Sequence, residues 1–345
     1  MNWFLYKEET MKKIISVTIL TLLSWQTNTV VAKQNVCIFD LLGKAGESYK
    51  LMEEWALASK EWGANVNLVA YQFEEQVAKD FKTQKCDAAA MTTMRSRDYN
   101  RFGGSIDALG GIPSNDIARK AILYAMDKRN AKRLVSEKNG VKYELAGITP
   151  LGIAYIFVRD RSINTLEKGK GKKFAYLHYD DAQKMAVERV GAIGVSSEIS
   201  NFVKKFNSGA VDAIAAPAYA YKPLEIHKGL GSNGAMFTYP VVNVTADLII
   251  KSDQFPDNFG MKSREWSVKQ LPKAFKNIER MEAEIPAKYK LPISKEDALR
   301  YQKLLRNGRI ELTQMGVYDP VMMSVLKKAR CTVDRTNFEC STAGE

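Results

Sequence analysis

Residues 204–221, KKFNSGAVDAIAAPAYAY, decide the fold because they repeat a pattern that residues 79–94, KDFKTQKCDAAAMTTM, have already set. In each segment a Phe, Phe81 or Phe206, is followed six places later by Asp-Ala and then by small apolar residues. An amphipathic helix that ends in a turn and feeds a buried strand gives this pattern, and small side chains suit a strand covered by helices on both faces. The repeat predicts two α/β lobes, although a strand after a helix is common enough for the match to be accidental.

Alternating strand and helix signals surround both copies of the repeat. Short apolar runs and helically spaced apolar residues predict two β/α units, each with a parallel sheet and helices on its faces. In the first unit these signals give strand 35–43, helix 51–62, strand 65–73, helix 77–81 and strand 86–92, followed by a helix over 116–137. In the second they give strands 152–160, 174–179 and 211–217 and helices 181–191 and 199–206.

The last part of the chain predicts one long strand and then mostly helix. Residues 237–250, FTYPVVNVTADLII, form a strand-like run that crosses back between the lobes, and helices are expected over 264–285, 294–315 and 319–328. We therefore expect an α/β protein of two lobes joined by a hinge, with C-terminal helices. The expected parts are lobe 1 at 33–150, lobe 2 at 151–240, a crossover strand and helices at 241–330, and a disulfide-closed tail at 331–345.

The first 32 residues read as a secretory signal peptide. A basic start at Met11-Lys12-Lys13 precedes the apolar run 14–25, and small residues end the segment at Ala32. Residues 1–10 look like an upstream start-site artefact, with Met11 as the true start. The alternative is an uncleaved anchor. Cleavage after Ala32 predicts an exported protein, located in the periplasm, and no later apolar run reaches the length of a spanning helix.

Four cysteines fit an oxidising compartment, where an even number suggests disulfides. Cys37 begins the first predicted strand and Cys86 immediately precedes the third, so the two could lie side by side. Cys331 and Cys340 are close enough in sequence to close a small loop. Of the three possible connectivities we favour Cys37–Cys86 with Cys331–Cys340.

Signs of catalysis, metal binding and nucleic-acid binding are weak. The chain has two histidines, His178 and His227, and lacks the G-x-S-x-G and H-E-x-x-H patterns. The G-x-G-x-x-G match at 229–234 precedes a strand-like segment rather than a helix, so it reads as a glycine-rich loop. The net charge of +12 favours anionic ligands or surfaces, or reflects solvated lysine faces. We expect a protein that is not an enzyme, with no catalytic residue, no metal, no cofactor and no nucleic-acid partner.

Polar and aromatic residues follow the predicted strands at their carboxyl ends, where open α/β sheets bind ligands. If the lobes face each other, these residues line one cleft, in which aromatic rings close over a ligand and charges orient it. Taken singly, Arg95 could belong to a solvated turn and Tyr221 could serve packing alone. The candidate ligand-binding residues are Asp40, Thr92, Thr93, Arg95, His178, Asp180, Tyr219 and Tyr221.

Two segments, NSGAVDAIAAPAYAYKPLEIHKGL (207–230) and TYPVVNVTADLIIKSDQFP (238–256), carry a family resemblance. Together with the signal peptide and the two lobes they resemble the solute-binding proteins of TRAP transporters. Gly209, Asp212 and Pro217 match that family's turn and strand end. The resemblance covers roughly 36–320. It implies a periplasmic-binding-protein-like fold that captures a small polar ligand between its lobes and delivers it to integral membrane transporter subunits.

More narrowly, the whole chain resembles the AdeT-type proteins. Some of these have been described as components of a resistance-nodulation-division efflux system for aminoglycosides. The resemblance therefore implies, as an alternative function, a periplasmic accessory of drug efflux involved in aminoglycoside resistance. A pump needs many spanning helices, so the chain cannot be the pump itself.

One position departs from the pattern of the TRAP family. That family places an Arg in the strand after the glycine-rich turn, where it clamps a substrate carboxylate. Here the strand is GKKFAYLHYDD (171–181), with Ala175 or Tyr176 at the place of the Arg. Arg95 could substitute for it, or Asp180 and Asp181 could suit a cationic ligand. A third hypothesis, a periplasmic enzyme on this scaffold, would depend on His178 and Asp180.

Overall fold

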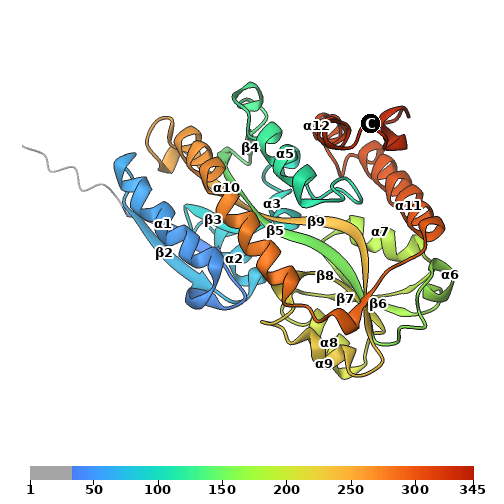
Figure 1. Cartoon of the computed structure of the whole chain (residues 1–345). Helices are drawn as coiled ribbons and strands as arrows, with labels where there is room; N and C mark the ends of the chain where they lie inside the picture. The colour runs from blue at the N-terminus through green and yellow to red at the C-terminus, as the bar shows by residue number, and fades with distance from the viewer. Residues whose placement is uncertain (1–32) are drawn as a thin grey trace, which may run out of the picture. The chain divides into compact units, whose positions relative to one another are not determined.

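The computed structural model describes residues 33–345, so the predicted signal peptide lies outside the described residues. Three strands form the first part of the sheet, with β1 (Gln34–Phe39) parallel to both β2 (Val66–Tyr71) and β3 (Ala88–Thr92). The helices α1 (Glu47–Glu61) and α2 (Glu74–Lys82) pack against these strands. We call the part built on β1, β2 and β3 lobe 1 (Figure 1).

A second set of parallel strands builds lobe 2. Here β6 (Lys173–Leu177) pairs with both β7 (Ile193–Ser197) and β8 (Ala213–Pro217). The helices around them are α6 (Leu166–Gly169), α7 (Asp181–Arg189), α8 (Phe202–Ser208) and α9 (Ile226–Leu230).

The repeat noticed in the sequence has the same structural role in both lobes. Asp87 accepts a hydrogen bond from the backbone N–H of Asn35 at 2.8 Å, and Asp212 accepts one from Lys173 at 2.8 Å. Each Asp thus fixes the start of its strand against the neighbouring parallel strand. The Phe six places earlier, Phe81 or Phe206, is fully buried beneath the helix. The repeated sequence therefore forms the same local structure, a helix end, a turn and the start of a strand, once in each lobe.

Two long antiparallel strands connect the lobes. β5 (Val141–Val158) and β9 (Ala235–Lys251) pair along most of their length, and their ends reach into different parts of the sheet. β9 pairs with β3 in lobe 1, whereas β5 pairs with β8 in lobe 2. One sheet of order β2-β1-β3-β9-β5-β8-β6-β7 results, with the short β4 (Val135–Lys138) beside β5 and β10 (Lys290–Leu291) beside β9. Figure 1 shows the two long strands side by side through the middle of the molecule.

The sequence interpretation was wrong on the strand before lobe 2. A helix over 116–137 and a strand over 152–160 were expected, but α5 (Asn115–Ala125) ends early and β5 already begins at Val141. Asn139 and Gly140 both adopt positive φ, as the tight turn between β4 and β5 requires. Pro150 and Gly152 hid the continuity of β5, because they look like a strand boundary. In the structure they coincide with a register shift inside it.

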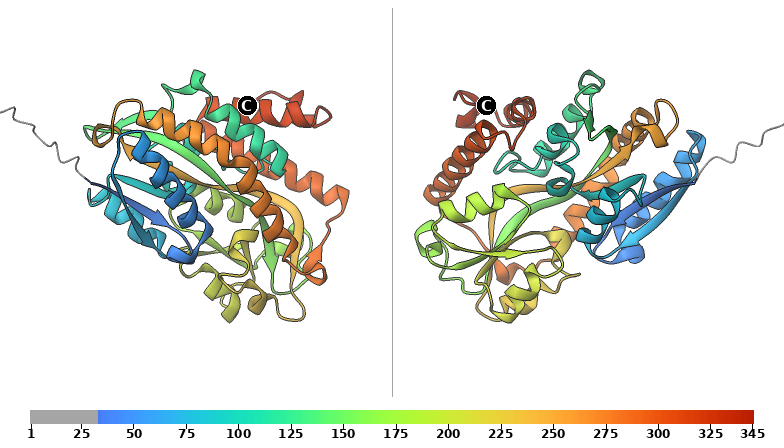
Figure 2. Two further views of the ribbon diagram at one scale, coloured as in Figure 1. Left: turned by 60° about the vertical axis from the view of Figure 1, so that its left-hand side comes forward. Right: turned by 180° about the vertical axis from the view of Figure 1, so that it is seen from behind.

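The remaining helices pack on the sheet and on other helices. They are the short α3 (Thr93–Ser96) and α4 (Arg101–Gly104) and the longer α10 (Phe259–Ala283), α11 (Lys295–Gln314) and α12 (Pro320–Val333). α10 lies across β5, α12 packs on α5, and α11 packs on α7 of lobe 2 (Figure 2). Within residues 33–345, no helix has the length and apolar character that a membrane crossing would need.

Both disulfides have the predicted connectivity. Cys37–Cys86 joins the middle of β1 to the residue before the turn into β3, and Cys331–Cys340 closes the tail onto α12. The tail brings Glu339 and Glu345 against the fully buried Arg309 and Arg330, so the two buried cations have two carboxylate partners.

Removing the larger disulfide loop should destabilise the protein more than removing the smaller one. In the chain-entropy account, a loop with a sequence separation of 49 stabilises by about 4 kcal/mol and one of 9 by about 2.5 kcal/mol. We expect Cys37→Ala/Cys86→Ala to lower the free energy of unfolding more than Cys331→Ala/Cys340→Ala, measured by guanidinium denaturation. An equal or reversed order would contradict the prediction.

Candidate functional site

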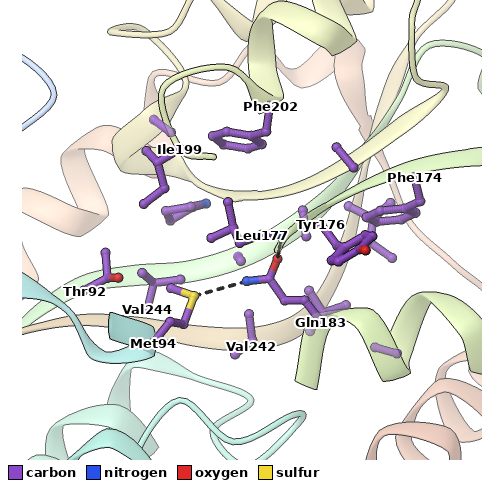
Figure 3. Close-up of a pocket in the computed structure, with 18 of the residues that line it drawn as sticks. Thr92, Met94, Phe174, Tyr176, Leu177, Gln183, Ile199, Phe202, Val242 and Val244 are labelled. Carbon is purple, nitrogen blue, oxygen red and sulfur yellow. Dashed lines mark hydrogen bonds between the residues drawn. The ribbon is translucent and has the colours of Figure 1, made fainter. Parts of the chain in front are cut away.

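A cavity of about 150 Å³ lies between the two lobes, where β5 and β9 cross from one to the other. Lobe 1 supplies the ends of β1 and β3, lobe 2 supplies β6, α7 and β8, and α11 closes one side. Figure 3 shows Met94 from lobe 1 and Gln183 from lobe 2 meeting across this space, with Phe202 and Ile199 on another wall. The sheet is therefore continuous, yet the residue 90s and the 174–220 region enclose a cavity between them.

Few polar groups face this cavity. The Thr92 side chain lines it at the end of β3, and its hydroxyl is buried without a hydrogen-bond partner among the described residues. Gln183 on α7 accepts from the backbone N–H of Leu177 at 3.0 Å and donates to the sulfur of Met94 at 3.1 Å. Sulfur is a weak acceptor, so this amide retains most of its capacity to donate. Thr92 and Gln183 thus give this wall a hydroxyl and an amide, neither of which carries a charge.

Beside the cavity, an ion-pair network fastens lobe 1 to lobe 2. Arg95 of α3 donates to Glu198, which follows β7, at 2.6 Å, and its guanidinium stacks 3.5 Å over the ring of Tyr179. Tyr179 donates to the buried Glu74 of lobe 1 at 2.9 Å, and His178 contacts Glu198 at 2.5 Å. We call these five residues the interlobe network. Arg95 of lobe 1 donates to Glu198 of lobe 2, and Tyr179 of lobe 2 donates to Glu74 of lobe 1, so the network links the two lobes.

Burial shapes the protonation of this network. Burial raises the pKa of Glu74, although the bond from the backbone N–H of Thr92 and the charge of Arg95 oppose that shift. The pKa of Tyr179 lies well above its usual value, first because of burial and then because of Glu74. Burial lowers the pKa of Arg95, but Tyr179, Glu74 and Glu198 outweigh it and leave the pKa raised. Arg95 is thus a permanent cation with its partners already in place.

A second arginine joins the lobes deeper in the structure. Arg97 bonds to Asp180 of lobe 2 at 3.1 Å and to the buried Asp107 at 2.5 Å. The fully buried Asp247 on β9 accepts from Ser96 at 2.6 Å, and its other oxygen is unpartnered among the described residues. Burial raises the pKa of Asp247 to about 7, and the nearby Asp107 adds to the shift.

The structure places the eight sequence-predicted residues in three settings. Thr92 and Tyr219 line the cavity. Arg95 and Asp180 lie in contacts between the lobes, and His178 contacts Glu198 within lobe 2. The others serve the scaffold: Asp40 caps α1 by accepting from Ser48 and Tyr49, Thr93 donates to Thr245, and Tyr221 packs on Phe157 in the core of lobe 2.

Sequence reasoning missed two groups of residues. It missed Glu74, which lies shortly after β2, and Glu198, which directly follows β7. Both lie at the carboxyl end of the second strand of their lobe, where open α/β sheets bind ligands. It also missed the apolar residues of the cavity wall, because only polar and aromatic residues at strand ends were considered as ligand contacts. Their signal is the helical spacing of Gln183, Ala186, Val187 and Val190 on one face of α7.

The described part of the chain was compared with the side-chain composition of metal sites. Among residues 33–345, His, Cys, Asp and Glu do not gather in a group of three that could hold a metal ion. The cavity wall likewise has none of these residues.

Two-lobe binding proteins with a cleft between lobes share this architecture. Solved structures of TRAP periplasmic solute-binding proteins from Ralstonia eutropha and Rhodoferax ferrireducens superpose with TM-scores of 0.68 and 0.67, at 14% and 12% identity. In both cases 88% of this chain and 99% of the other are covered. The predicted fold class, a two-lobe α/β fold of the periplasmic-binding-protein kind, is confirmed.

Sequence comparison gives the family more narrowly. The family model "Solute-binding protein AdeT 1/2" matches residues 48–345. The probable solute-binding protein AdeT1 of Acinetobacter baumannii is 43% identical over 89% of this chain and 100% of its own length. AdeT2 of the same organism is 27% identical over 69% of this chain and 98% of its own length. The chain belongs to the AdeT1/2 family of solute-binding proteins, as its sequence predicted.

Loss of Arg95 should destabilise the closed protein, because Glu74 would remain buried without its cation. We expect Arg95→Ala to lower the free energy of unfolding by about 3 kcal/mol, and Glu74→Gln in the same protein to restore part of it. Chemical denaturation of the two single variants and the double variant measures the coupling. Arg129→Ala, which breaks an exposed pair with Asp127, should lower the free energy of unfolding much less than Arg95→Ala does. Equal losses for the two arginines would refute the role of the network.

Asp247 should make stability depend on pH. The unfolded carboxyl ionises near pH 4, whereas the folded one keeps its proton to about pH 7, so stability falls as pH rises between these values. Asp247→Asn mimics the protonated form. Its stability relative to the wild type should rise by about 1 kcal/mol or more from pH 5 to pH 8. Denaturation at several pH values tests this, with the exposed Asp253→Asn as the control.

Proposed function

We propose that this protein is an exported solute-binding protein that captures a small molecule between its two lobes and delivers it to a TRAP-type transporter. The observation that carries the proposal is the cavity between lobes that are held together by direct polar contacts. A molecule inside it is surrounded by both lobes, and its release requires their separation, as in hinge closure around a ligand. Pro150 and Gly152, at a register shift of β5, lie where such bending would occur.

Ligands named for the structural neighbours support a small-molecule role. The protein from Ralstonia eutropha was solved with bound (S)-2-acetolactate, that from Rhodoferax ferrireducens with malonate, and one from Shewanella oneidensis with succinate. Delivery would need integral membrane subunits as partners. Two disulfides and the expected signal peptide favour a periplasmic location.

A role in aminoglycoside efflux is the alternative, and it requires a different ligand. Aminoglycosides are polycations, which binding sites neutralise with carboxylates. The part of the chain that the structure describes places neither Asp nor Glu in the cavity wall. The cavity therefore favours solute capture over aminoglycoside binding, and kanamycin serves below to compare the two.

Bound solute should be recoverable from the protein itself. We expect purified protein to release a small molecule on denaturation, detected by mass spectrometry, and to gain melting temperature when that molecule is returned. A panel of succinate, malonate and kanamycin tests the two ligand classes in parallel.

Tyr219→Ala, in the cavity wall, should weaken binding of the recovered molecule at least tenfold, whereas Tyr124→Ala on α5 should not. Absence of a released molecule, together with no response to any added solute, would contradict the proposed function. Binding of kanamycin alone would favour the efflux role.

A further inference from the structure

The cavity wall is uncharged. Among the described residues that line it, Asp, Glu, Lys, Arg and His are absent, and the polar side chains are Thr92, Gln183 and three tyrosines. The rest are aliphatic, aromatic or sulfur-containing, from both lobes and from α11. An ion in this space would lose its water without gaining a counter-charge, which is costly in a protein interior.

The two arginines that follow the wall residue Met94 are already neutralised. Arg95 pairs with Glu198 and Glu74, and Arg97 pairs with Asp107 and Asp180. Recruiting either arginine to a ligand carboxylate would leave a buried carboxylate of the protein without its partner. The cleft therefore uses its charges to hold the lobes together rather than to orient an ionic ligand.

Cavity size limits the ligand further. A dry protein cavity of about 150 Å³ lined by aliphatic and aromatic side chains accommodates a benzene molecule. Side chains such as Val187, Ile199 and Phe202 give this cavity the same kind of wall. Burial of the ligand's apolar surface would supply the binding free energy.

Two neutral groups could orient such a ligand. Thr92 is 3% exposed. Its hydroxyl is buried and has no hydrogen-bond partner within the described chain, which is unfavourable. Gln183 offers an amide N–H that now contacts the sulfur of Met94. A hydroxyl or carbonyl oxygen on the ligand would satisfy one or both.

We infer that the cavity takes an uncharged, mainly apolar molecule of about the size of benzene, with one hydroxyl or carbonyl group near Thr92 and Gln183. This inference rests on the proposed solute-binding function and narrows its ligand class. It replaces the small polar ligand expected from the sequence with a largely apolar one. It also sets the protein apart in ligand chemistry from the neighbours solved with malonate and succinate.

Three probes of nearly equal size separate charge from shape: benzyl alcohol, benzoate and benzylamine. Titration calorimetry and thermal shift with the purified wild-type protein at pH 7 give the affinity of each. We expect benzyl alcohol to bind at least tenfold more tightly than either ion. In a Thr92→Val variant, the affinity for benzyl alcohol should fall several-fold, while the affinity for toluene, which lacks the hydroxyl, should not change.

A blocking variant shows whether binding occurs in the cavity. Ala186→Phe fills it from α7, so benzyl alcohol binding should be lost. Glu188→Phe puts the same side chain on the exposed face of the same helix and should leave binding unchanged. Circular dichroism of both variants checks that they are folded.

The outcomes distinguish this inference from the function on which it rests. Tighter binding of benzoate or benzylamine, blocked by Ala186→Phe, would overturn the ligand class but keep the solute-binding function. Binding of benzyl alcohol that survives Ala186→Phe would overturn the site. Failure of all three probes, while succinate or malonate binds, would also overturn the inference and leave the proposed function standing.

Discussion

Antiparallel pairing of β5 with β9 is the constraint on which the rest of this structure depends. β9 pairs with β3 of lobe 1, β5 pairs with β8 of lobe 2, and the two long strands pair with each other, so the lobes share a hydrogen-bonded backbone and cannot separate fully. The pairing has four register shifts along its length. The register shift at Pro150 and Gly152, with φ of 104° at Gly152, lies beside the cavity. The same pairing therefore holds the lobes together and places the site between them.

Charge in this protein serves closure of the lobes. Lobe 1 supplies Arg95, Arg97 and Glu74, and lobe 2 supplies Glu198, Asp180 and the Tyr179 hydroxyl. This arrangement explains how a chain with a net charge of +12 can enclose an uncharged cavity. The field of the surface lysines acts on the surroundings of the protein, while the paired charges beside the cleft cancel locally. Net charge was therefore a poor guide to the character of the cavity wall.

The fold could be predicted from local signals because each lobe is built from them. The Asp of the repeated turn, the helix stripes and the disulfide pairing all depend on residues near each other in sequence or on adjacent strands. β5 was predicted poorly because its continuity past Pro150 depends on pairing with β9, which is distant in sequence. Among the candidate site residues, Thr92 and Tyr219 do line the cavity, whereas Asp40 and Tyr221 have local structural roles that the sequence could not separate from ligand contact.

The anchoring of α11 has a consequence for the route of ligand exit. Tyr301, Leu304 and Leu305 of this helix form part of the cavity wall, and its buried Arg309 bonds to the backbone carbonyl of Leu109, another wall residue, and to Glu339 of the tail. This side of the cavity is thus fixed to its surroundings and is a poor exit. A molecule held in the cavity would therefore have to leave by a side other than the one that α11 covers.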